Sequence, residues 1–142
     1  MFSPNQADVR RFFCAAYRKQ LEQAPMEAIE HLAAQWIQEH PEYHSLLADE
    51  ERALAHTGEA DAHNPFLHLS MHLSVSEQCS IDQPPGIRQA VEQLVQRHDD
   101  LHTAQHEVMA CLGDMLWHSQ RQGQPPDGQA YLEAVRRLVS RD

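Results

Sequence analysis

The clearest helical signal in the chain is the stretch IEHLAAQWI at residues 29–37. Its apolar side chains fall at positions i, i+3, i+4, i+7 and i+8, so they line one face of an α-helix. The stretch follows Pro25 and stops before Pro41, which pushes His40 out of the helical region of backbone space. We therefore predict an amphipathic helix that buries one face and ends near residue 40.

Helical periodicity continues on both sides of this stretch. Upstream, Ser3 and Gln6 fit a capping box and Pro4 fits the first helical position, which predicts a helix from about Pro4 to Leu21. Downstream, apolar spacing and prolines indicate further helices, with a polar loop at 56–63 between the first two of them. They cover residues 41–55, 65–79, 87–97, 99–120 and about 131–139. No stretch alternates convincingly as a strand does. The expected fold is all-α, a single-domain bundle of six or seven helices over residues 1–142.

Composition disfavours several classes of partner. The chain has 21 acidic and 11 basic residues and a formal net charge of −10, which argues against binding nucleic acid or anionic lipid. No apolar run approaches the roughly 20 residues of a membrane span, and the first residues lack the features of a secretory signal. Three widely spaced cysteines without a C-x-x-C motif suit a reducing compartment. We expect a cytoplasmic protein with no nucleic-acid or membrane partner, and a homo-oligomer or a protein partner stays open.

Histidine is the compositional anomaly, with eleven in 142 residues. The predicted helix over 65–79 carries His68 and His72 one turn apart, and Cys79 falls on the same stripe. Apolar residues flank this stripe on both sides, while the serines gather on another face. A buried imidazole needs a hydrogen bond, a carboxylate or a metal ion as its partner. These two histidines are therefore the first candidate functional residues.

A second histidine pair lies on the predicted helix over 99–120. His102 and His106 have the same i, i+4 spacing, and His98 stands one turn earlier. Two helices that each present such a pair can converge and place four imidazole nitrogens around one divalent ion. The predicted site is a divalent transition-metal site, with zinc favoured, formed by His68, His72, His102 and His106.

Motif spacing narrows the chemistry of such a site. His106 and Glu107 begin like the zincin motif H-E-x-x-H, but Ala110 stands at the second ligand position. A di-iron centre needs Glu-x-x-His motifs, and these helices offer none. A mononuclear, histidine-rich site remains, and an open coordination position would permit hydrolysis through a bound water. Carboxylates that could orient its ligands are Glu77, Asp99 and Asp114.

The histidines outside these two pairs are not predicted to form the site. The run EHPEYH at residues 39–44 crosses a helix boundary, so capping is its favoured role and a ligand contribution from His40 or His44 the minority one. Cys79 is expected to pack rather than to act as a thiolate ligand. No role is assigned to His31, His56, His63 and His118. In a histidine-rich chain i, i+4 pairs also arise by chance, so a non-catalytic interaction or assembly module with structural histidines is the alternative.

Four runs of sequence together resemble a family of small bacterial proteins known only as domain of unknown function 1841. They are EHPEYH (39–44), NPFLHLSMHL (64–73), QPPGI (83–87) and CLGDMLW (111–117). The resemblance extends nearly from end to end, and NPFLHLSMHL is its most specific part. It implies a single cytoplasmic bacterial domain and no particular activity. The family often has an acid at the position of Ala110, so a carboxylate that would complete a His102 and His106 set is missing here.

Overall fold

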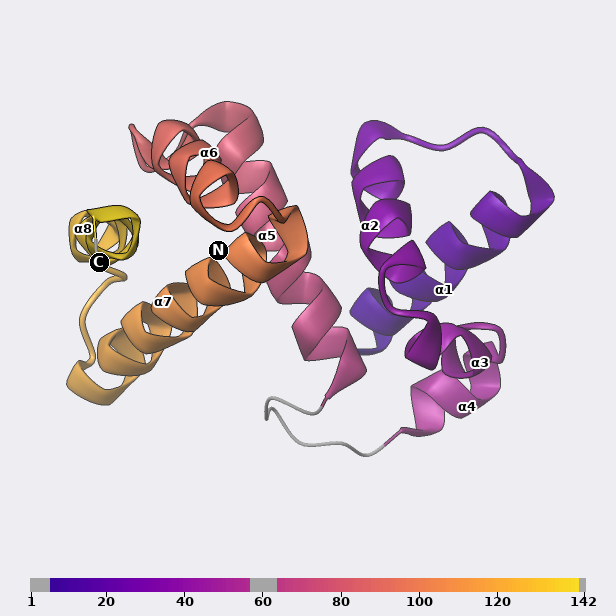
Figure 1. Cartoon of the computed structure of the whole chain (residues 1–142). Helices are drawn as coiled ribbons and strands as arrows, with labels where there is room; N and C mark the ends of the chain where they lie inside the picture. Colours follow the sequence, from indigo (N-terminus) through magenta and orange to yellow (C-terminus); the bar gives the residue numbers. More distant parts are fainter. Residues whose placement is uncertain (1–5, 57–63, 141–142) are drawn as a thin grey trace. The chain divides into compact units, whose positions relative to one another are not determined.

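The computed structural model of the chain describes residues 6–56 and 64–140 (Figure 1). These residues form helices and connecting segments without a strand, which confirms the all-α class. The chain divides into two compact units, Met1–Leu73 and Ser74–Asp142, and the division falls inside the helix α5 (Pro65–Ile81). The predicted single domain stays a prediction. Within the described ranges no helix is long and apolar enough to cross a membrane.

The first unit is built on α1 (Gln6–Glu22) and α2 (Ala28–Gln38), which pack against each other. The proposed capping box at Ser3 and Gln6 lies outside the residues whose side chains are described. The amphipathic stretch at residues 29–37 forms most of α2, as predicted. Its buried face joins side chains of α1 and of the first half of α5 in one core, whose largest members are Phe13, Trp36, Ile37, Leu47, Phe66 and Leu69.

The predicted helix over 41–55 is instead three short elements. They are the 3-10 helix η1 (Pro41–Tyr43), α3 (His44–Leu47) and α4 (Glu50–Ala55). The break before α4 is made by Asp49, whose backbone is extended and whose carboxylate accepts a hydrogen bond from the Arg52 amide at 3.1 Å. A short acidic side chain stabilises a helix start in this way. This break raises the number of α-helices in the described ranges to eight, one above the predicted range.

A buried guanidinium ties the elements of the first unit together. Arg10 on α1 is only 6% exposed and donates hydrogen bonds to the carbonyls of Ala53 and Leu54, each at 3.3 Å, and to that of His56. These carbonyls lie at the C-terminal end of α4 and just beyond it, where partners within the helix run out, and the Ala53 carbonyl also accepts from the His56 amide at 3.3 Å. The same guanidinium lies over the Phe66 ring, 5.1 Å from its centroid. Arg10 thus fixes the end of α4 and the first turn of α5.

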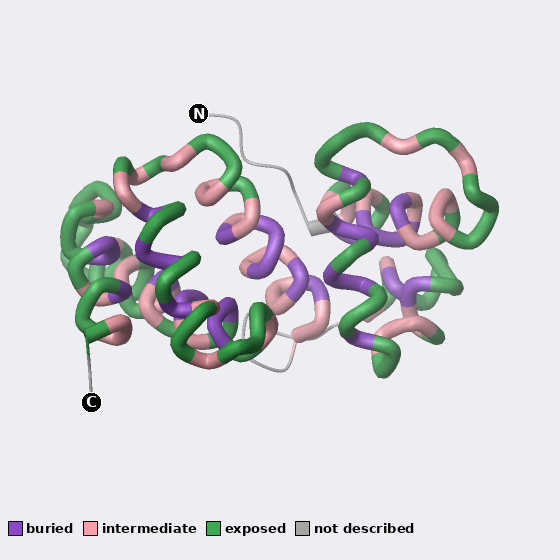
Figure 2. Tube along the Cα trace, turned by 45° about the horizontal axis from the view of Figure 1, so that its top comes forward, coloured by how far each residue is buried: buried purple, intermediate pink, exposed green. Residues whose placement is uncertain are grey.

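The second half of α5 begins the second unit, which continues with α6 (Ile87–His98), α7 (Leu101–Gln122) and α8 (Gly128–Ser140). Buried positions recur along each helix with exposed ones between them (Figure 2), and the α6–α8 core contains Ile87, Leu94, Val108, Leu112, Tyr131 and Val135. Leu101 is 51% exposed because it is the first residue of α7.

The boundary between α6 and α7 separates His98 from His102 and His106, which lie on α7. Asp99 adopts a left-handed conformation with φ of 54°, and the Asp100 carboxylate caps α7 by accepting from the Thr103 amide at 3.0 Å. His98 is therefore the last residue of α6, and its Nε2 lies 2.9 Å from a carboxylate oxygen of Glu107. It does not continue a histidine row along α7.

Candidate metal centre

The helix α5 presents His68 and His72 on one side, as predicted. Asn64 caps the helix by accepting from the Phe66 amide at 2.9 Å, and Pro65 occupies the first helical position. The Nε2 atoms of His68 and His72 lie 3.2 Å apart. His72 is fully buried and His68 is partly buried. One turn of helix therefore brings two imidazole nitrogens to the same point.

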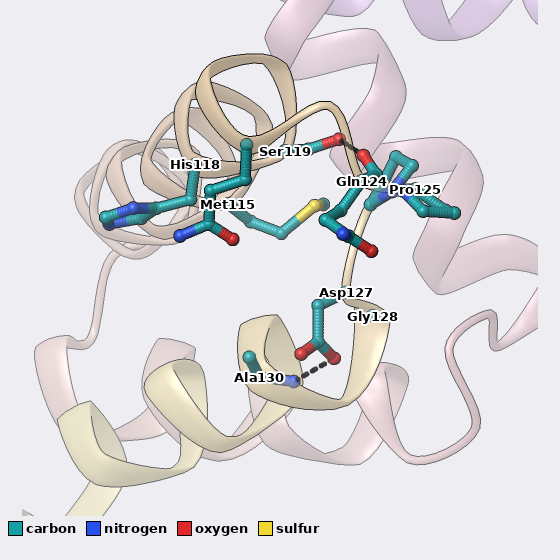
Figure 3. Close-up of a pocket in the computed structure, with 10 residues that line it drawn as sticks. Met115, His118, Ser119, Gln124, Pro125, Asp127, Gly128 and Ala130 are labelled. Carbon is teal, nitrogen blue, oxygen red and sulfur yellow. Dashed lines mark hydrogen bonds between the residues drawn. The ribbon is translucent and has the colours of Figure 1, made fainter.

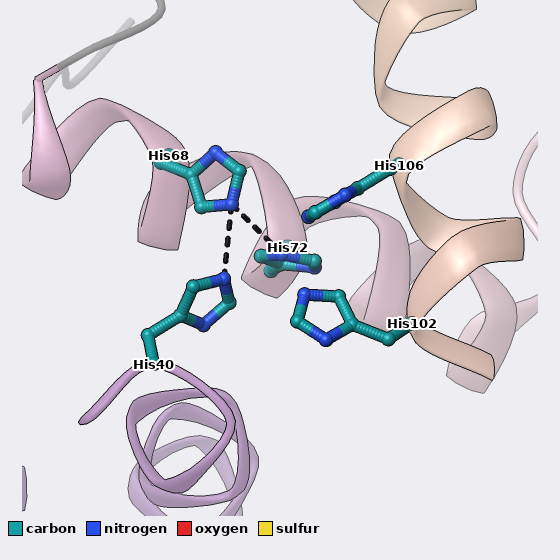
Figure 4. Close-up of side chains that lie close together, drawn as sticks. All are labelled: His40, His68, His72, His102 and His106. Carbon is teal, nitrogen blue, oxygen red and sulfur yellow. Dashed lines mark hydrogen bonds between the residues drawn. The ribbon is translucent and has the colours of Figure 1, made fainter. Parts of the chain in front are cut away.

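A third imidazole reaches this point from the end of α2. The Nε2 atom of His40 lies 3.0 Å from Nε2 of His68, and the His40 ring is 3% exposed (Figure 4). The ring's other nitrogen, Nδ1, lies 2.7 Å from the carbonyl oxygen of Trp36 and donates to it. The three imidazoles belong to one unit, each offers a ring nitrogen within 4.8 Å of those of the other two, and together they could hold a metal ion. We call His40, His68 and His72 the histidine group.

Two histidines of the run at residues 39–44 bond main-chain carbonyls at the end of the preceding helix, α2. His40 bonds the Trp36 carbonyl, and Nε2 of His44 lies 2.8 Å from the Ile37 carbonyl. Both carbonyls belong to the last turn of α2, where intrahelical partners run out. Neither ring caps the helix that follows. The structure shows no side-chain cap at the start of η1 or α3; His40 and His44 instead bond the end of α2, and His40 also lies among the converging histidines.

Aromatic rings cover two of the three imidazoles. The indole of Trp36 stacks on the His72 ring, with centroids 4.0 Å apart and planes at 13°. The phenol of Tyr43 stacks on the His40 ring at 5.2 Å and 2°. Burial, and then the carboxylate of Glu42, raise the pKa of the Tyr43 hydroxyl, which keeps the phenol neutral beside the histidines. The imidazole planes are held by contacts on their faces as well as by hydrogen bonds.

The other predicted pair lies on α7, in the second unit. The His102 and His106 rings have centroids 4.4 Å apart, and Figure 4 draws both side chains on their helix. His102 is half-buried and His106 is exposed. Between them in the sequence, the buried Gln105 amide donates to the Ser76 hydroxyl on α5 at 3.4 Å. That both pairs bind the same ion stays a prediction.

The carboxylates expected to orient the ligands are all exposed. Glu77, Asp99 and Asp114 each present their side chains to solvent. The carboxylate bonded to a histidine is instead that of Glu107, which pairs with His98. For His40, a main-chain carbonyl performs the orienting role that the sequence assigned to a carboxylate.

The Cys79 thiol does not belong to the group of side chains that could hold a metal ion. Burial raises the pKa of its thiol to about 11, the Glu92 carboxylate acting in the same direction and Arg88 opposing it. At pH 8 the thiolate fraction is then on the order of one in a thousand, against about a quarter for an ordinary cysteine. Only the thiolate binds a metal or attacks an electrophile. The structure supports the expectation that Cys79 packs.

We predict slow alkylation of Cys79. At pH 8 iodoacetamide should modify it roughly a hundredfold more slowly than free cysteine in the same solution, because so little thiolate is present. The rate should rise about tenfold per pH unit up to the region of pH 11. Peptide mass spectrometry over a time course measures this, and modification at the rate of free cysteine would contradict it.

A cavity of about 660 Å³ lies elsewhere in the second unit, where α7 ends and α8 begins (Figure 3). Met115 and the exposed His118 line it from α7. Its other polar groups hold the connection between the helices: the Ser119 hydroxyl donates to the Gln124 carbonyl, and the Asp127 carboxylate caps α8 by accepting from the Ala130 amide at 3.0 Å. The sequence assigned no role to His118, and this open lining position gives it none.

Fold and site together define an all-α protein with a histidine group that could hold a metal ion. The chain belongs to the family described as domain of unknown function (DUF1841), which matches residues 5–137. This confirms the resemblance seen in the sequence. No curated protein and no solved structure matches the chain.

Proposed function

We propose that the protein binds one divalent transition-metal ion, with zinc favoured, through the imidazoles of His40, His68 and His72. The observation that carries this proposal is the convergence of three Nε2 atoms, with His68 at 3.0 Å from one neighbour and 3.2 Å from the other. Imidazole nitrogen is a common ligand of zinc, copper, iron and nickel. Zinc is favoured among them because it most often occupies small sites with nitrogen ligands.

The number of N–H groups that the three imidazoles carry supports a cation between their Nε2 atoms. A neutral imidazole carries one N–H, and that of His40 is donated from Nδ1 to the Trp36 carbonyl, so its Nε2 presents a lone pair. The Nε2 of His68 can either donate or accept in the ring plane, but not both. While the rings are neutral, at most one of its two contacts can be an N–H···N hydrogen bond. A metal ion accepts all three lone pairs at once.

The distances between the nitrogens agree with this reading. With zinc–nitrogen bonds of about 2.05 Å, adjacent ligand atoms stand about 2.9 Å apart at a right angle and about 3.3 Å apart at the tetrahedral angle. The two measured separations, 3.0 Å and 3.2 Å, fall within that range. The carbonyl that fixes the His40 ring is the kind of partner that metal-binding histidines commonly have.

His102 and His106 are proposed as the further ligands of the same ion. The spacing of the pair supports this. His102 and His106 stand one turn apart on α7, as His68 and His72 do on α5, so each pair can present two imidazoles on one side of its helix. Whether the ion also keeps a position for water, and so supports hydrolysis, depends on how many of the five rings bind.

Metal titration of protein purified without a polyhistidine tag tests the proposal. After removal of metal with a chelator, the protein should bind one equivalent of Zn²⁺ per chain. At a free concentration 100 times Kd the metal should stabilise the fold by about 2.7 kcal/mol. The His68→Ala/His72→Ala variant should lose both effects, whereas His31→Ala, at an exposed position on α2, should keep them.

Two results would contradict the proposal in different ways. Binding of less than a tenth of an equivalent, unchanged in the double variant, would leave a protein with structural histidines. An oligomer or partner complex that persists through chelation and substitution would then favour the interaction module. Zinc affinity unaffected by His102→Ala/His106→Ala would instead confine the site to the three imidazoles of the first unit.

A further inference from the structure

Two of the three converging imidazoles contact Trp36, one through its main chain and one through its side chain. Trp36 accepts a hydrogen bond from Nδ1 of His40 through its main-chain carbonyl, at 2.7 Å. Its indole ring stacks on His72 at 4.0 Å between centroids. His40 follows α2 and His72 lies on α5, so Trp36 joins two elements that are far apart in the sequence. Trp36 itself is 5% exposed and belongs to the core of the first unit.

The carbonyl contact sets the protonation of His40. The last carbonyls of α2 have no intrahelical amide to accept from, so the Trp36 carbonyl is open to another donor. Because His40 is four residues further on, its ring returns over this carbonyl and donates from Nδ1. The remaining nitrogen, Nε2, must then carry the lone pair while the ring is neutral. The contact therefore selects the tautomer that can bind a metal through Nε2.

The indole contact restricts the His72 ring. The indole plane lies at 13° to the His72 ring. Because His72 is fully buried, turning its imidazole about the Cβ–Cγ bond would break this stacking and lose packing. An imidazole bound to a divalent ion is also poor in electrons, and the face of an indole attracts positive charge more strongly than that of phenylalanine or tyrosine. Stacking should therefore be stronger in the metal-bound protein than in the free one.

We propose that Trp36 is a positioning residue of the metal site, which fixes the His40 tautomer through its carbonyl and the His72 ring plane through its indole. This inference rests on the proposed function. Only the second action depends on the side chain, so substitution isolates it. Residues that orient the ligands of a metal contribute about ten- to a hundredfold to its affinity.

The test compares Trp36→Leu and Trp36→Phe with the wild type. Competition with a chelating dye should show Zn²⁺ affinity about ten- to a hundredfold lower in Trp36→Leu, and largely recovered in Trp36→Phe, which keeps a stacking ring. The visible spectrum of the Co²⁺-loaded protein should change in Trp36→Leu because the His72 ligand is reoriented. Trp117→Leu is the matched control, since Trp117 is 54% exposed on α7 and should leave affinity and spectrum unchanged.

The outcomes separate this inference from the proposed function. If the wild type binds no zinc, both are wrong. If it binds zinc and Trp36→Leu binds it equally well with the same cobalt spectrum, only the positioning role is wrong. Should Trp36→Leu fail to fold, nuclear magnetic resonance of the zinc-loaded wild type decides. The role requires a ring-current shift of the His72 protons and a proton on Nδ1 of His40, and the absence of either overturns it.

Discussion

Replacing His40 with alanine is expected to lower Zn²⁺ affinity by about a hundredfold or more. Residues that merely orient a ligand contribute up to about a hundredfold, and loss of a ligand should cost at least as much. Its Nε2 lies 3.0 Å from that of His68, and its Nδ1 is already engaged by the Trp36 carbonyl. Isothermal titration or dye competition on the metal-free variant measures the change. The variant should still fold, because His40 is outside the helices and η1 begins after it.

His44→Ala provides the control for this prediction. His44 is one turn further along the same segment, and its ring also bonds a carbonyl of the last turn of α2. Its ring lies 5.0 Å from that of Tyr17, at a tilt of 32°, and His44 does not belong to the histidine group. Both substitutions thus remove a capping imidazole, and only one removes a proposed ligand. Equal losses of zinc affinity in the two variants would mean that the end of α2, not the His40 nitrogen, matters for binding.

Arg10→Met is expected to give the largest loss of stability, about 3 kcal/mol. Hydrogen bonds from a charged donor contribute about 1.5–3 kcal/mol, and methionine removes the guanidinium that donates to the carbonyls of Ala53, Leu54 and His56. It also removes the guanidinium from the face of Phe66. Urea denaturation followed by circular dichroism measures the change as a lower midpoint with an unchanged m value.

The neighbouring Arg11 is the control for this substitution. Its side chain is 54% exposed and lies 3.5 Å from Asp8 and 3.8 Å from Glu50. Exposed pairs of this kind contribute little, so Arg11→Met should change the free energy of unfolding by no more than about 0.5 kcal/mol. Similar losses from Arg10→Met and Arg11→Met would show that the buried hydrogen bonds do not stabilise the unit.

Much of the fold follows from local sequence because helices are local structures. The apolar spacing at residues 29–37 predicted an element that the structure contains. The segment at 41–55 was predicted less well. Its apolar spacing fits one helix, but Asp49 competes for the backbone amide of Arg52 and begins a new one. Periodicity does not register such a competition.

The candidate site was half predictable for the same reason. His68 and His72 are one turn apart on a helix whose polar residues gather elsewhere, so local geometry alone indicates a shared site. His40 reaches them only through packing of the end of α2 against α5, which no sequence period encodes. The available signal was the pair Trp36 and His40, spaced four residues apart across a helix end. The same limit applies to His102 and His106, whose pairing on α7 follows from the sequence but whose ligand role does not.

Arg10 has a consequence for how firmly the start of α5 is held. It holds the His56 carbonyl on one side of residues 57–63 and the Phe66 ring on the other, and the His56 and Phe66 rings are themselves 6.0 Å apart. The distance between His56 and Phe66 is therefore set by packing within the first unit. The start of α5, and with it the imidazoles of His68 and His72, keeps its place through these contacts.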